Sequence, residues 1–155
     1  MEYHHFVIAR ALHILGIVLW IGGVAFVTTV LIPAIRHNQS PDNQLSLFEL
    51  LEGKFSFQAK LSTLLTGISG FYMLHFMDAW GAIAWWVYLM IFVWAIFTLV
   101  LFVFEPLFLH KWFHARAQKN GEKAFFILQS MHIILLCISL LAVAGGVAGA
   151  HGLFS

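Results

Sequence analysis

Residues 9–23 decide the fold: they read ARALHILGIVLWIGG and form the front half of an apolar run from Phe6 to Ile35. Only Arg10 and His13 place an ionisable side chain in that run. Because about 20 apolar residues are enough to cross a bilayer, the run predicts a membrane span. A histidine about two turns inside hydrocarbon is costly unless it has a partner. His13 is therefore the first candidate functional residue.

Glycines surround this histidine along the helix. Gly16, Gly22 and Gly23 leave room for a neighbouring helix, or for a flat molecule, close to the backbone. A buried imidazole beside such space is what a haem-carrying membrane helix requires. A histidine that only hydrogen-bonds to a neighbouring helix explains the same residues, and this helix alone does not separate the two interpretations.

The composition places the whole chain in the membrane. Of its 155 residues 61% are hydrophobic and 10% are charged, whereas soluble domains are about 45–50% apolar. We therefore expect one transmembrane domain over residues 1–155, with the lipid bilayer as a partner and no nucleic-acid partner. Cys137 is the only cysteine, which excludes an internal disulfide and a cysteine-based metal cluster.

Four apolar runs predict helices over about 6–35, 57–78, 83–109 and 124–150. Short connections favour an all-α, up-down-up-down four-helix bundle. The connection 36–56 is polar, and within it Leu45–Glu52 could form an amphipathic helix on the membrane surface. The connection 110–124 is polar and basic. Pro106, just before it, should loosen the helical hydrogen-bond ladder.

The basic residues predict the orientation. Arg10 belongs to one face of the membrane, and the other seven Lys and Arg residues belong to the face of the connections 36–56 and 110–124. By the positive-inside rule both termini lie outside. The pattern is typical of a bacterial inner membrane protein. A homo-oligomer is left open.

When residues are sorted by depth in the membrane, several candidate metal ligands lie toward the outer face. The outer leaflet holds His13, His75 and Met90 on three different helices, with Met90 at nearly the depth of His13 and His75 closer to the outer end. Imidazole and thioether are usual axial ligands of haem iron. No Cys-x-x-Cys-His motif is present, so the cofactor would be a non-covalent haem b. His13 is the expected ligand, with His75 as first choice and Met90 as second choice for the other. Alternatively His75 is an interfacial histidine and Met90 fills the core.

Other polar residues carry weaker hypotheses. Arg10 lies one turn before His13 and could pair with a haem propionate, or it could reach lipid headgroups. His132 could ligate a second haem, or act with Glu105 to handle protons for a quinone. A hydrogen-bonded pair that only holds two helices together is the alternative.

Short strings resemble a known group of proteins. Leu12-His13-x-x-Gly16-x-x-x-Trp20-x-x-Gly23 resembles the first helix of small four-helix membrane proteins related to the copper-resistance D proteins and to the HemJ-type protoporphyrinogen oxidases. Thr66-x-x-x-Gly70-x-x-Met73-Leu74 is similar to their second helix. The resemblance implies that His13 is associated with haem. This chain differs from the HemJ type at two places. It has Met90 where the HemJ type has lysine, and Gln129-Ser130-Met131-His132 where the HemJ type has Asn-Glu-x-Pro.

These observations favour a membrane cytochrome b that passes electrons between a quinone pool and a redox partner at the outer face. Two axial ligands leave no open iron position, which suits electron transfer. One alternative is a HemJ-like protoporphyrinogen oxidase, so whether the protein is an enzyme stays open. A second alternative is a copper-handling membrane protein, indicated by Met73, Met77 and Met90 toward the outer end.

Overall fold

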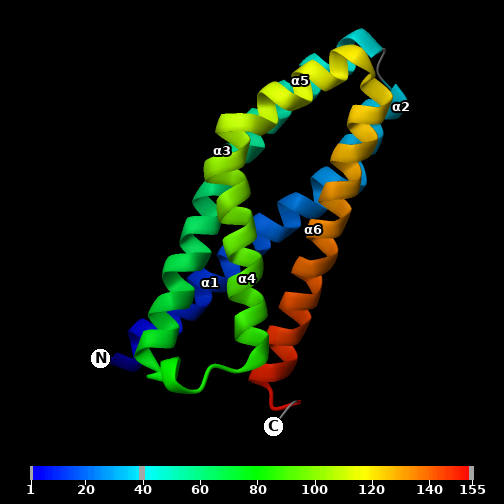
Figure 1. Ribbon diagram of the computed structural model, residues 1–155. Helices are drawn as coiled ribbons and strands as arrows, with labels where there is room; N and C mark the ends of the chain where they lie inside the picture. The colour runs from blue at the N-terminus through cyan, green and yellow to red at the C-terminus, as the bar shows by residue number, and fades with distance from the viewer. Residues whose placement is uncertain (1, 39–40, 154–155) are drawn as a thin grey trace.

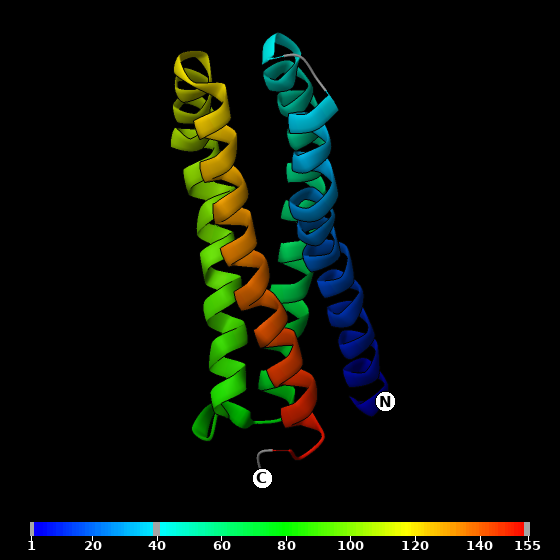
Figure 2. The same cartoon turned by 90° about the vertical axis from the view of Figure 1, so that its right-hand side faces the viewer.

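The computed structural model describes residues 2–38 and 41–153, and every long element in this part of the chain is helical. The elements form two helical hairpins that pack side by side (Figures 1 and 2). In chain order they are α1 (Glu2–Phe26), the π-helix η1 (Val27–Leu31), α2 (Ile32–Asn38), α3 (Pro41–Phe76), the 3-10 turn η2 (Ala79–Gly81), α4 (Trp85–Leu99), the π-helix η3 (Val100–Leu109), α5 (His110–Lys119) and α6 (Gly121–Ala150).

The first hairpin pairs the continuous helix α1–η1–α2 with α3, and the second pairs α4–η3–α5 with α6. Both termini and the α3–α4 connection lie at one end of the bundle, which we call the termini end (Figure 1). There the Phe6 and Phe76 rings stack at 5.3 Å between centroids, which ties the start of α1 to the last turn of α3. Asp78, with a left-handed φ of 48°, turns the chain out of α3.

Both π-helical stretches lie next to a proline. Pro33 follows η1 by two residues and Pro106 lies inside η3. A proline has no N–H and its ring clashes with the carbonyl one turn earlier, so the helix widens to a longer hydrogen-bond spacing. The disturbance predicted at Pro106 takes this form.

Three helical stretches are long and apolar enough to cross a membrane: Tyr3–Asn38, Trp85–Leu107 and Gly121–Ala150. This agrees with an integral membrane protein. Their outward faces carry exposed apolar residues such as Ile14, Phe92 and Leu141, as expected of a surface that meets lipid. The predicted span 57–78 lies in α3, which does not belong to these three stretches.

The prediction of a separate surface helix at Leu45–Glu52 was wrong. This stretch forms early turns of α3, which continues unbroken to Phe76. The physical reason is burial inside the protein: Phe48 is 3% exposed and packs its ring against Phe113 and Phe125. The polar stretch after residue 109 is also largely helical, as α5. Asn120 then caps α6, because its side-chain oxygen accepts a hydrogen bond from the Lys123 N–H at 3.0 Å.

Candidate functional site

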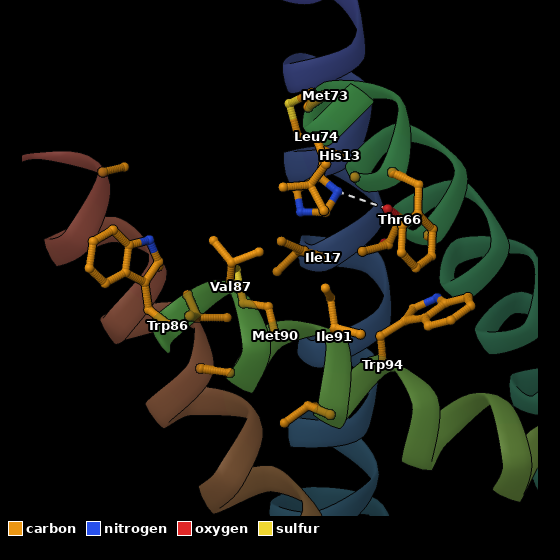
Figure 3. Close-up of a pocket in the computed structure, with 18 of the residues that line it drawn as sticks. His13, Ile17, Thr66, Met73, Leu74, Trp86, Val87, Met90, Ile91 and Trp94 are labelled. Carbon is orange, nitrogen blue, oxygen red and sulfur yellow. Dashed lines mark hydrogen bonds between the residues drawn. The ribbon is translucent and has the colours of Figure 1, made fainter. Parts of the chain in front are cut away.

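A cavity of about 530 Å³ lies between the two hairpins toward the termini end. All four long helices contribute to its wall (Figure 3). Cofactor and small-molecule sites usually measure about 300–1,000 Å³ and are mostly apolar with a few placed polar groups. This cavity fits that description, because its lining is apolar apart from a few residues: Arg10, His13, Thr66 and Ser139 carry its charged, imidazole and hydroxyl groups.

His13 reaches the cavity from α1, and its ring is held by α3. The Nδ1 atom lies 2.8 Å from the Thr66 carbonyl oxygen and 3.3 Å from the Ser69 hydroxyl oxygen. Since a carbonyl can only accept, Nδ1 carries the hydrogen and donates it. The Ser69 hydroxyl donates to the Leu65 carbonyl at 2.6 Å, so its oxygen is also free to accept from Nδ1.

This hydrogen bonding sets the chemistry of the other ring nitrogen. In a neutral imidazole with hydrogen on Nδ1, Nε2 keeps its lone pair. The edge of the ring opposite Thr66 faces the α4 side of the cavity, where Val87 and Met90 lie (Figure 3). Metal-binding histidines commonly have this arrangement, in which one nitrogen donates to a carbonyl and the other is the ligand.

Glycines make the space for the ring and for the helix contact beneath it. A Cβ atom on Gly70 would lie 2.9 Å from Cε1 of His13, so any larger residue there would push the imidazole away. A Cβ on Gly16 would collide with the Thr66 side chain, so this glycine lets α1 and α3 approach closely. Of the three glycines expected to leave space on α1, Gly16 admits the backbone of α3 and Gly23 admits the Phe55 ring, whereas a Cβ on Gly22 would meet no atom within 4 Å. The glycine beside His13 comes from α3.

The second hairpin supplies a thioether in a similar setting. Met90 lines the cavity from α4, and a Cβ on Gly146 of α6 would lie 2.8 Å from its sulfur. Met73, near the end of α3, and Met77, the residue after that helix, also line the cavity. Three of the five methionines of the chain thus border the same space as His13.

Tryptophans build much of the remaining wall. Trp94 donates its indole N–H to the Thr63 carbonyl at 2.9 Å, which ties α4 to α3, and its ring rests on Gly67. Trp86 rests on the backbone of α6 at Gly149. Trp20, only 3% exposed, lies at the inner end of the cavity and meets Phe97 edge to face at 4.8 Å. Flat indole surfaces of this kind suit an aromatic occupant.

The structure brings together some of the predicted site residues and separates others. Arg10, His13 and Met90 line the one cavity. His75 is exposed in the last turn of α3 and does not line it. His132 lies outside the cavity on α6, and its Nδ1 donates to the Leu128 carbonyl of its own helix at 2.9 Å.

Glu105 has partners other than the expected His132. Its carboxylate accepts hydrogen bonds from the Ser56 hydroxyl and from the Lys60 ammonium, the latter at 3.0 Å. This ion pair joins α3 to η3 across the two hairpins. Arg36 donates to the side-chain oxygen of Gln129 at 2.6 Å, also between hairpins.

Sequence reasoning missed the supporting role of α3. Thr66, Ser69 and Gly70 fall within one turn and a half and together hold the His13 ring. In the sequence, Thr66 and Gly70 drew attention through their resemblance to the second helix of the copper-resistance D and HemJ-type proteins, which did not indicate that they would contact His13.

A metal site built from several protein ligands is not found in residues 2–38 and 41–153, since these contain no group of three or more His, Cys, Asp or Glu side chains placed to hold an ion. The cavity instead offers one histidine and nearby methionines. Comparisons with protein-family models, with curated proteins and with solved structures found no match for this chain.

Proposed function

We propose that this protein is a membrane b-type cytochrome, with haem b in the cavity between the hairpins. When bound, haem b supplies a one-electron iron couple. The observation that carries the proposal is the Nδ1 hydrogen bond of His13 to the Thr66 carbonyl, because it leaves the Nε2 lone pair for a metal.

His13 and Met90 are the ligands that we propose. Met90 is preferred to His75 because it borders the same cavity as His13, whereas His75 is exposed outside it. Histidine with methionine is an established axial pair of electron-transfer haems. A Cβ atom on Gly70 would press against His13, and one on Gly146 would press against Met90. Glycine at these two positions therefore fits a site in which both side chains need room.

The electrons would pass between a quinone pool in the bilayer and a redox partner at the outer face. We further propose that α3 is a fourth span, so that the chain is an up-down-up-down bundle in a bacterial inner membrane with both termini outside. Two observations support this: α3 runs alongside α1 (Figure 2), and its Lys60 is paired with Glu105. Pairing lowers the cost of a charge in a span.

An absorption spectrum of the purified chain tests the haem. We expect sharp α and β bands after reduction, and we expect His13→Ala to lose the haem while His75→Ala keeps it. Met90→Leu should keep the haem but lose the six-coordinate spectrum, with Met131→Leu, an exposed residue outside the cavity, as its matched control. A colourless protein from cells with ample haem would overturn the proposal.

Quinol tests the direction of electron flow. A reduced short-chain quinone should reduce the bound haem in membranes as completely as dithionite does. If dithionite alone reduces it, haem binding stands and the quinone pool is the wrong donor.

A copper-handling protein is a second candidate, supported by the three methionines that border the cavity with His13. Thioether ligands favour Cu(I). This function predicts one bound copper ion per chain and no Soret band, so metal analysis of the same sample separates it from the cytochrome.

A further inference from the structure

The cavity is open at one end and closed at the other. Among its lining residues, Arg10, Met77, Ala82 and Ala150 are also exposed, and all four lie toward the termini end. They come from α1, the α3–α4 connection and α6, so they surround an opening of the cavity and do not follow a single helix–helix contact.

The opposite end of the cavity is sealed by packed side chains. Trp20, Val93, Ser139 and Ala142 line it there and are each less than 5% exposed. Behind them Phe97 and Leu136 belong to the same core cluster as Trp20. A ligand therefore has no route from this side without unpacking the core.

Charge distinguishes the mouth from the sealed end. Arg10 is exposed at the mouth, and it is the only Lys or Arg among the described residues that line the cavity. The sealed end carries no charged side chain: its polar groups are the Ser139 hydroxyl, which donates to the Leu135 carbonyl of its own helix at 2.7 Å, and the buried indole N–H of Trp20. An arginine at the rim of an apolar cavity favours a carboxylate there, because the guanidinium makes charge-assisted, two-point hydrogen bonds to carboxylates.

From this polarity we infer that the occupant enters through the termini end with its apolar edge first, and that its carboxylates stay at the mouth with Arg10. The inference rests on the proposed haem site and names what that site recognises: a flat amphiphile with acidic groups along one edge. Arg10 is then a specificity residue, and the mouth is the route of loading.

Hemin and its dimethyl ester, in which both carboxylates are blocked, test the orientation. The full chain is made without haem and placed in nanodiscs of phosphatidylcholine. We expect the unaltered chain to bind hemin about tenfold more tightly than the ester, and Arg10→Gln to remove that preference by weakening hemin alone. Lys54→Gln, which removes an exposed cation at the other end, should keep the preference.

Loading rates test the mouth. Ala150→Trp places a large ring at the rim and should slow hemin association about tenfold. Ala144→Trp is the matched control, since Ala144 is exposed on the same helix but does not line the cavity.

The outcomes separate this inference from the function it rests on. Hemin binding that retains the preference for free carboxylates in Arg10→Gln, or unchanged loading in Ala150→Trp, overturns the inference and leaves the haem site standing. Failure of every chain to bind either porphyrin overturns both.

Discussion

The two ends of this bundle use the same helices in opposite ways. At the termini end the hairpins enclose a cavity, with glycines, methionines and tryptophans around it. At the opposite end the rings of Phe48, Phe113 and Phe125 meet one another at 5.1–5.6 Å between centroids and fill the centre. We call these the cavity half and the packed half.

Polar ties between the hairpins follow the same division. The Lys60–Glu105 ion pair and the Arg36–Gln129 hydrogen bond lie on the packed side of the cavity, while Trp94 with Thr63 provides a tie at the cavity itself. The comparison indicates that the packed half holds the hairpins together, which allows the cavity half to keep open space. Four substitutions test this division of roles, starting from the one with the largest expected effect.

Phe125→Ala should have the largest effect. Phe125 is 1% exposed in the packed half, and removing such a ring typically lowers the free energy of unfolding by about 3–5 kcal/mol. Denaturant titration in detergent measures the change. Phe126→Ala is the control, because Phe126 is 61% exposed and should change stability by no more than about 0.5 kcal/mol. Equal effects at the two positions would contradict a packed half.

Glu105→Gln should have a smaller effect on the same measurement. The substitution leaves Lys60 without its ion pair, and because both side chains are partly exposed we expect a loss of about 1–2 kcal/mol. Replacing both charges, as Lys60→Met with Glu105→Leu, should recover most of that loss. If the double variant is no more stable than Glu105→Gln, the ion pair does not hold the two hairpins together.

Gly70→Ala should weaken haem binding in the cavity half and leave the stability of the fold nearly unchanged. The added Cβ displaces the His13 ring, so haem affinity should fall about tenfold. Stability without haem should stay close to that of the unaltered chain. Gly53→Ala is the control, because a Cβ there meets no atom within 4 Å. Full haem affinity in Gly70→Ala would show that the ring position does not matter.

Ser69→Ala should have the smallest effect. It removes the more distant of the two acceptors at Nδ1, and we expect haem affinity to change by only about 0.5 kcal/mol. Because an imidazole with a weaker hydrogen bond donates less electron density to iron, the midpoint potential should rise. A potential measured by redox titration would distinguish this positioning role from simple packing, which would leave the potential unchanged.

Much of the architecture could be predicted from hydropathy, because apolar length determines what can cross a bilayer. Three of the expected spans are long and apolar enough in the structure. The helical character of Leu45–Glu52 could also be predicted, but its burial could not. An amphipathic stretch has the same pattern whether its apolar side meets lipid or, as with Phe48, other rings.

For the candidate site, the sequence predicted the depth of each residue in the membrane but not the helix face on which it lies. Counting along the helices placed His13, Met90 and His75 in the same leaflet, but only the first two line the cavity. A rise per residue gives height, whereas the face on which a residue lies depends on how the helices are rotated in the bundle. For the same reason the pairing of Glu105 with Lys60 was not foreseen.

Each π-helix lies where its helix passes from one core cluster to the other. Val24 and Phe97, which precede η1 and η3, belong to the first cluster, whereas Val27, the first residue of η1, and Phe113, which follows η3, belong to the second. A widened turn absorbs an extra residue and so resets the angular phase of the helix that follows. The two helices that contain the π-helices, α1–η1–α2 and α4–η3–α5, can therefore present one face to the cavity and a differently rotated face to the aromatic core. We expect an insertion near the termini end to be absorbed at these turns, so that the cavity half can change in shape while the packed half keeps its contacts.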